Sequence, residues 1–199
     1  MFGPSKDQIW KEFSDTIGGS MHPGGFSEGW WGGESGIRVR YKGLEIIFDT
    51  YEDFFSRPRF KYTRVRARYQ SSNPLNFTIR DKTFLDLFLG WLPHYSVKTD
   101  DRDFNWNFTC DASDESQLRV LLSFPIVRHL LKDISTLELK SRNKYGLGVF
   151  STNFPAGTLE LYLRVPGIEK DPVRLNRLYQ LFTEVLDRLE ELGVRTVNA

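Results

Sequence analysis

Residues 171–193, DPVRLNRLYQLFTEVLDRLEELG, contain the pattern that decides the fold. Apolar side chains recur there at the i, i+3, i+4, i+7 spacing of one helical face: Leu175, Leu178, Tyr179, Phe182, Val185, Leu186, Leu189 and Leu192. Asp171 can cap the first backbone N–H groups, Pro172 suits the first helical position, and Gly193 suits the left-handed residue after the last turn. A helix of this length needs a sheet or other helices to cover its apolar face.

The rest of the chain predicts clusters of strands separated by short helices. A helix is expected over 5–17, a hairpin over 37–50, and further strands over 60–70 and 75–79, so that four successive strands are antiparallel. The later elements are a short helix after Asp81, a strand over 103–110, helices over 114–122 and 125–133, and strands near 136–141, 146–151 and 158–165. The order is α–ββββ–α–β–αα–βββ–α. We therefore expect an α+β fold in which mostly antiparallel sheet is covered by the long C-terminal helix.

The composition is that of a globular protein. Of 199 residues, 40% are apolar and 27% are charged, which fits one domain over 1–199 with a sizeable core, although two cryptic halves near 1–98 and 99–199 are an alternative. The net charge of +1 gives no general attraction to nucleic acid, which we consider an unlikely partner, or to a membrane surface. No apolar run approaches 18 residues, so we expect no membrane span and a cytoplasmic protein.

A glycine-rich stretch, GGSMHPGGFSEGWWGGESG, occupies residues 18–36 and has eight glycines and one proline. We expect no regular structure there. It nevertheless carries three large aromatic rings, Phe26, Trp30 and Trp31. Two interpretations remain open: the rings pack back onto the core, or the segment is a lid that closes over a ligand.

Arginine gives the most unusual pattern. Arg64, Arg66 and Arg68 alternate along one predicted strand, which puts them on one face about 6.8 Å apart. A neighbouring strand would add Arg38 and Arg40. Residues 37–80 carry ten positive and four negative side chains in all.

Three interpretations of this arginine-rich face remain open. It could be a solvated sheet face whose guanidinium groups pair with cross-strand acids such as Glu45 and Asp49. It could instead be a surface for a protein partner, or a site for nucleic acid or a small anion, because guanidinium groups bind carboxylates and phosphates with two hydrogen bonds.

No catalytic or metal-binding constellation can be assembled from these residues. Cys110 is the only cysteine, which excludes an internal disulfide and a cysteine-based metal centre, and it falls on an apolar strand face where a thiol is inert. The histidines, His22, His94 and His129, lack metal-ligand spacing. The acidic run 100–103 lacks the glycine and distal glutamate of a calcium loop. We predict no catalytic residue, no metal and no cofactor.

Several short motifs together resemble a family of uncharacterised bacterial proteins. They are a helix ending in Ile17-Gly18-Gly19, a strand beginning Tyr62-Thr63-Arg64, an acidic loop leading into Phe104-x-x-x-Phe108, a helix with Leu121-Leu122, and the striped C-terminal helix. This chain has Asn105 where an acid would be expected. The resemblance implies a bacterial source and an α+β fold, and it implies no activity.

The sequence therefore favours a non-enzymatic binding protein whose partner is another protein or a second copy of itself. The alternative is a carrier of an apolar small ligand, with a cavity under the C-terminal helix and residues 18–36 as lid, and a small anion is a further candidate ligand. An enzyme ranks third. The candidate binding residues are Arg38, Arg40, Arg64, Arg66, Arg68, Phe26, Trp30 and Trp31.

Overall fold

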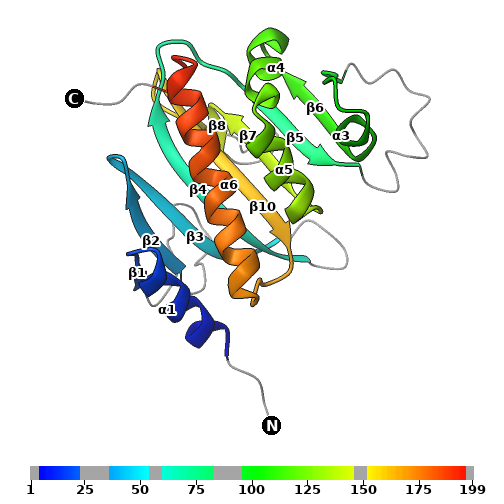
Figure 1. Ribbon diagram of the computed structural model, residues 1–199. Helices are drawn as coiled ribbons and strands as arrows, with labels where there is room; N and C mark the ends of the chain where they lie inside the picture. Colours follow the sequence, from blue (N-terminus) through cyan, green and yellow to red (C-terminus); the bar gives the residue numbers. More distant parts are fainter. Residues whose placement is uncertain (1–4, 23–35, 54–59, 83–95, 146–151, 196–199) are drawn as a thin grey trace.

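The computed structural model describes residues 5–22, 36–53, 60–82, 96–145 and 152–195. Within these residues, an antiparallel sheet of eight strands forms one layer and helices cover one of its faces (Figure 1). The helices are α1 (Lys6–Thr16), α3 (Arg102–Asn107), α4 (Glu115–Ser123), α5 (Pro125–Ile134) and α6 (Pro172–Glu191). The sheet strands are β1 (Ser20–His22), β2 (Gly36–Tyr41), β3 (Leu44–Asp53), β4 (Phe60–Gln70), β5 (Phe77–Asp81), β6 (Phe108–Ala112), β7 (Glu138–Arg142) and β10 (Thr158–Pro166). A small separate ladder joins β8 (Lys144–Tyr145) and β9 (Thr152–Asn153). The predicted α+β class is confirmed.

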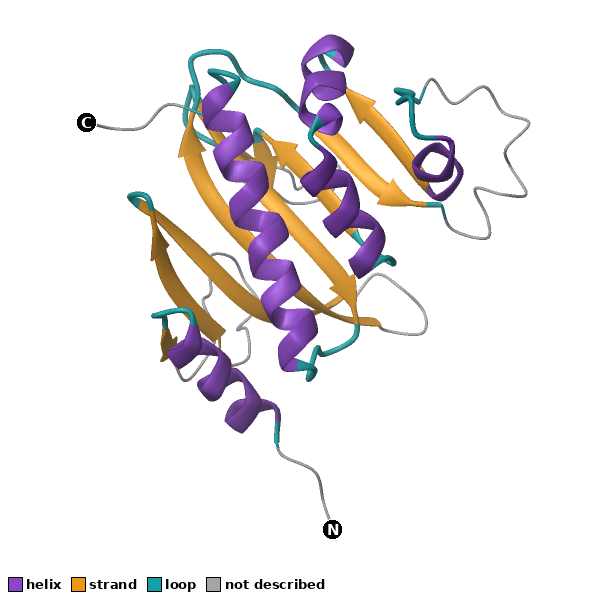
Figure 2. Ribbon diagram, in the orientation of Figure 1, coloured by secondary structure: helices purple, strands orange, loops and turns teal. Residues whose placement is uncertain are grey.

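Helix α6 lies across the middle of the sheet, between α1 and α5 (Figure 2). The Asp171 side chain accepts a hydrogen bond from Val173 N, as expected of a cap, and Gly193 has a φ of +66°. The predicted apolar face is buried except at its margins, where Tyr179 and Leu192 are half-buried. Leu181 lies outside the predicted face and is also fully buried, because neighbouring helices cover the sides of α6.

The strand order is β1-β2-β3-β4-β10-β7-β5-β6. The four successive strands β2 to β5 are antiparallel, as predicted, but only β2, β3 and β4 are direct neighbours: β5 pairs with β7 and β6, and the far side of β4 pairs with β10. Most residues of β10 are buried on both faces, which is typical of a central strand. Residues 1–98 and 99–199 thus contribute strands to one sheet.

The aromatic segment before β6 differs from its prediction. Residues 102–107 form helix α3 and only 108–112 are a strand, because the Asp101 carboxylate caps a helix by accepting a hydrogen bond of 2.9 Å from Phe104 N. The Phe104 and Phe108 rings stack 4.7 Å apart in the core, whereas Trp106 is 71% exposed. The expected one-faced strand over 103–110 is therefore wrong.

The glycine-rich stretch begins with a strand, which corrects the expectation that it holds no regular structure. Residues 20–22 form β1 against β2. A Cβ at Gly19 would lie 3.0 Å from Arg38 O and from Ile37 Cγ2, so this close approach of two chain segments requires glycine. Phe26, Trp30 and Trp31 lie outside the described residues, as do the predicted helix after Asp81 and the predicted strand over 146–151.

Candidate functional site

The sheet has an apolar face under the helices and a polar face on the opposite side. Strand β4 shows the alternation: its buried inner side chains include Val65 and Ala67, whereas Arg64 and Arg66 point away from the helices. Pairing extends this polar surface across the sheet, and we call it the outer sheet face. Its side chains include Arg38, Arg40, Glu45, Ile47, Asp49, Tyr51, Tyr62, Arg64, Arg66, Arg68, Thr78, Arg80, Asp111, Glu138, Lys140, Arg142, Glu160, Tyr162 and Arg164.

Asp49 holds two of the predicted arginines in place. Its side chain is 1% exposed, and its two oxygens accept hydrogen bonds from Arg64 Nε and Nη2, the latter over 2.8 Å. Arg66 Nη2 donates to Asp49 Oδ2 over 3.2 Å. A buried carboxylate with two guanidinium partners is a fixed part of the structure, in contrast to an exposed surface pair.

Two arginines and two tyrosines form a stack beside this pair. The Tyr51 and Tyr62 rings are 5.3 Å apart and nearly parallel, the Arg64 guanidinium lies over Tyr51 at 4.9 Å, and the Arg164 guanidinium lies over Tyr62 at 4.9 Å. Arg164 Nη1 also donates to the Tyr51 hydroxyl over 2.8 Å, and its Nε lies 2.5 Å from Glu138 Oε2. Cation–π contact and hydrogen bonding together restrict these side chains to one arrangement.

A second buried acid organises the neighbouring strands. Glu160 is 3% exposed, and Arg142 donates two hydrogen bonds to its Oε2 while lying 4.3 Å over the Tyr162 ring. Burial, together with repulsion from Arg164 and Arg142, lowers the pKa of Lys140 although Glu138 lies beside it. The Glu138 carboxylate lies 2.9 Å from Lys140 Nζ and 2.5 Å from Arg164 Nε, so two cations share this one acid.

The structure brings together all five predicted arginines. Arg38 donates to Glu45 over 3.2 Å, Arg40 is exposed and lies opposite Glu45 in the β2–β3 register, and Arg68 is exposed beside Phe154. Cross-strand pairing with Glu45 and Asp49, one of the three interpretations, is confirmed for Arg38, Arg64 and Arg66.

Sequence reasoning missed the contributions of β7 and β10. The alternation of Glu160, Tyr162 and Arg164 was visible, but only the placement of β10 between β4 and β7 shows that these side chains join the arginines of β4.

The reactive or metal-binding side chains considered elsewhere in the chain either already have partners or are unreactive. Burial raises the pKa of the Cys110 thiol to about 12, with a smaller contribution from Asp111, so the thiol is uncharged at neutral pH. Asp101 caps α3 and pairs with Lys132 over 2.6 Å, and Asp100 pairs with Arg128 over 2.8 Å. Among the described residues, no group of three or more histidine, cysteine or acidic side chains could hold a metal ion.

The comparisons with known proteins give one informative similarity. No protein-family model and no curated protein sequence matches the chain. The fold resembles a crystal structure of the mycobacterial trehalose monomycolate transport factor A, TtfA. The TM-score is 0.59 with 6% sequence identity, over 97% of this chain and 98% of that chain. At this identity the similarity establishes a shared fold along nearly the whole of both chains.

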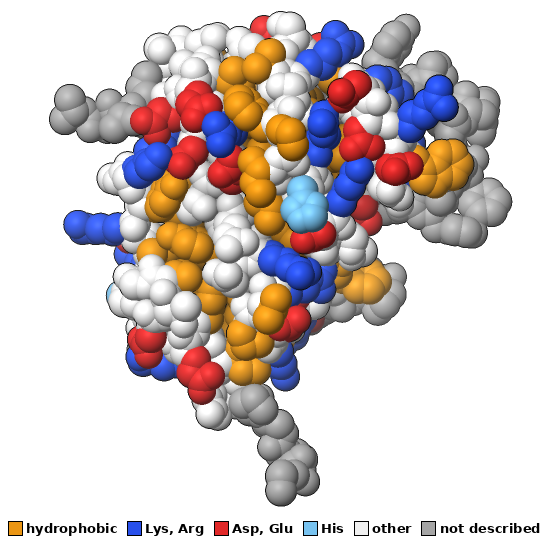
Figure 3. All heavy atoms as spheres, viewed as in Figure 1, with side chains coloured by type: hydrophobic (Ala, Val, Ile, Leu, Met, Phe, Trp, Pro, Cys, Tyr) orange, Lys and Arg blue, Asp and Glu red, His pale blue; other side chains and the backbone are white. Residues whose placement is uncertain are grey.

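On the side of the molecule that they cover, the helices carry acidic and basic side chains among the apolar ones (Figure 3). None that the structure describes combines the length and the apolar character needed to cross a bilayer.

Proposed function

We propose that this protein works by binding, and that a protein partner or a second copy of the chain docks on the outer sheet face. The observation that carries the proposal is the array of arginine and tyrosine side chains held in place by Asp49 and Glu160. Arginine and tyrosine are enriched among the residues that dominate interface energies. Because these side chains are already ordered, a partner pays little conformational entropy to engage them.

Two further observations support a binding role over catalysis. The Cys110 thiol is buried and protonated, so it offers no nucleophile. The protein with a similar fold is called a transport factor, and this name describes transport rather than a reaction. We further propose a cytoplasmic location, where a free thiol such as Cys110 stays reduced.

The packing under α6 favours docking over the carrier alternative. A carrier would need a cavity between α6 and the sheet. The α6 side chains that face the sheet and the neighbouring helices have 0% of their surface exposed: Leu175, Leu178, Leu181, Phe182, Val185, Leu186 and Leu189. A lid formed by 18–36 stays a prediction, since 23–35 lie outside the described residues.

Site-specific photocrosslinking tests the proposal. The photoreactive residue p-benzoylphenylalanine is placed at Thr78, which is half-buried on the outer sheet face and carries no charge, or at Gln180, which is exposed on α6. The cells that naturally make the protein are irradiated, and adducts are purified under denaturing conditions. We expect one discrete adduct from position 78 and none from position 180. An adduct of twice the chain mass identifies self-association. No adduct from position 78, or equal yields from both, contradicts the proposal.

A further inference from the structure

The outer sheet face has more positive than negative charge, and two of its acids, Asp49 and Glu160, are buried. Among the side chains that the structure describes, nine cationic ones share the face with five acidic ones: Arg38, Arg40, Arg64, Arg66, Arg68, Arg80, Lys140, Arg142 and Arg164, against Glu45, Asp49, Asp111, Glu138 and Glu160. The side chains of Asp49 and Glu160 are 1% and 3% exposed, whereas those of Arg64 and Arg142 are 22% and 26% exposed. A partner would therefore meet guanidinium groups rather than these two carboxylates.

Several cations on the face lack full compensation. Arg64 and Arg164 lie directly opposite each other in the β4–β10 register, and like charges in that position repel. Arg66 is buried, and within the described residues its one bond to an acid is that of 3.2 Å to Asp49, while its Nε has no hydrogen-bond partner there. Asp49 is shared by Arg64 and Arg66, and Glu138 is shared by Lys140 and Arg164. An approaching anion would reduce this repulsion and supply acceptors.

We propose that the partner docked on the outer sheet face presents an acidic segment, rich in aspartate and glutamate, to these arginines. The inference rests on the proposed function and names the chemistry of its partner. Arg64, Arg66 and Arg68 recur about every 6.8 Å along β4, the same spacing as alternate side chains of an extended chain, so one segment can engage several of them. Carboxylates bind guanidinium groups through paired hydrogen bonds.

The arrangement favours a protein segment over nucleic acid. Duplex DNA carries one negative charge per about 1.7 Å of axis, and such dense charge would meet Glu138 and Asp111 as well as the arginines. Acidic residues separated by neutral ones avoid that repulsion. Nucleic-acid binding also uses aromatic rings that are open for stacking, and Tyr51 and Tyr62 are already stacked on each other and on arginines.

The test uses the full chain and a fluorescein-labelled 12-residue peptide of alternating glutamate and threonine. The control ligands are the same peptide with glutamine for glutamate and a labelled 12-nucleotide single-stranded DNA. The variant Arg40→Gln/Arg68→Gln removes two exposed cations from the face. The matched control, Arg119→Gln/Arg177→Gln, removes two exposed cations from α4 and α6. Thermal unfolding of both double variants verifies that the fold is retained.

Fluorescence anisotropy in low salt should show saturable binding of the glutamate peptide that weakens steeply as salt rises. We expect Arg40→Gln/Arg68→Gln to weaken it about tenfold, and Arg119→Gln/Arg177→Gln to change it less than twofold. Equal binding of the glutamine peptide, an equal loss in the control variant, or binding of DNA without binding of the glutamate peptide overturns the inference.

The two proposals fail in different ways. If position 78 gives a discrete adduct but the glutamate peptide does not bind, the docking face stands and its partner is not acidic. If position 78 gives no adduct, the docking face itself is wrong.

Discussion

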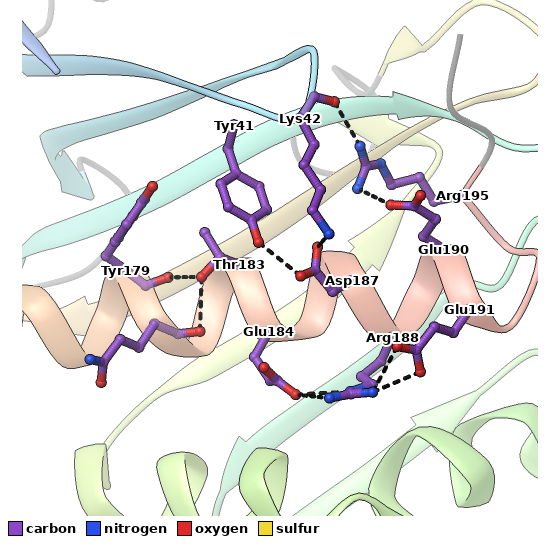
Figure 4. A network of polar contacts seen from close by, with 11 residues as sticks. Tyr41, Lys42, Tyr179, Thr183, Glu184, Asp187, Arg188, Glu190, Glu191 and Arg195 are labelled. Atoms are coloured by element: carbon purple, nitrogen blue, oxygen red, sulfur yellow. Dashed lines mark hydrogen bonds and ion pairs between the residues drawn. The ribbon is translucent and has the colours of Figure 1, made fainter. Parts of the chain in front are cut away.

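The Tyr41 hydroxyl donates a hydrogen bond of 2.8 Å to Asp187 Oδ2 and so ties the β2–β3 hairpin to α6 (Figure 4). Lys42, at the turn of the hairpin, places its Nζ 3.0 Å from Asp187 Oδ1. Arg195, beyond the end of α6, donates to Lys42 O and to Glu190, each over 2.9 Å. One end of the long helix is thus fastened to a strand turn that lies about 150 residues earlier in the sequence.

We expect Tyr41→Phe to lower the free energy of unfolding by about 1 kcal/mol, because it removes one hydrogen bond to a charged acceptor and leaves the ring contacts intact. Urea denaturation followed by circular dichroism measures the change. Tyr179→Phe is the matched control, since Tyr179 contacts the Tyr41 ring and its hydroxyl forms no hydrogen bond with any residue that the structure describes. A loss in Tyr179→Phe as large as in Tyr41→Phe would argue against the role of the bond.

Alkaline pH should weaken the hydrogen bond between Tyr41 and Asp187. Burial, followed by the hydrogen bond and the negative charge of Asp187, raises the pKa of Tyr41 to about 12. The folded protein therefore keeps a proton that the unfolded chain, with an ordinary pKa near 10, has lost. The corresponding stability is fully present below about pH 10 and is lost as the pH rises towards 12. The free energy of unfolding, measured at intervals from pH 9 to 12, should fall less steeply with pH for Tyr41→Phe than for the wild-type chain. Parallel curves for the two proteins would contradict this.

Asp49→Asn should be strongly destabilising. It removes the charge that compensates Arg64 and Arg66, and breaking a buried ion pair on one side costs about 3–5 kcal/mol. Glu45→Gln removes the acid of a largely exposed pair with Arg38 and should cost less than about 1 kcal/mol. Chemical denaturation of the two variants gives the comparison. Similar midpoints would show that Asp49 does not anchor the outer sheet face.

Cys110 should resist thiol reagents in the folded protein. Its side chain is buried in the core and its pKa is raised to about 12, so both access and the thiolate form are lacking at pH 8. Reaction with a disulfide reagent should reach one equivalent within minutes in urea. In native buffer it should proceed only as fast as the chain opens. Rapid labelling of the native protein would indicate that this part of the core is open.

Local patterns predicted the elements well and failed at two kinds of position. The α6 helix and the β2–β3 hairpin were predictable, because their caps, turn residues and periodicity all agree. Helix α3 was not predicted. Phe104, Trp106 and Phe108 alternate as in a strand, but the Asp101 side chain caps this segment and stabilises a helix. The pairing of β4 with β10 could not be predicted from local patterns either, because residues 158–166 lie far from β4 in the sequence.

The candidate site followed the same division. Arg64, Arg66 and Arg68 were predictable as one face because a single strand carries them. Arg164 and Arg142 were not, because their proximity to that strand depends on the sheet order rather than on any local pattern.

The central position of β10 has a consequence for synthesis of the chain. While the ribosome makes the protein, β4 and later β7 emerge before β10, the strand that lies between them in the sheet. One edge of each strand therefore stays unpaired until residues 158–166 have been made. Exposed strand edges of this kind invite pairing with other chains. The nascent polypeptide should therefore depend on chaperones until residues 158–166 have left the exit tunnel, and a message truncated before the codon for Thr158 should yield aggregates.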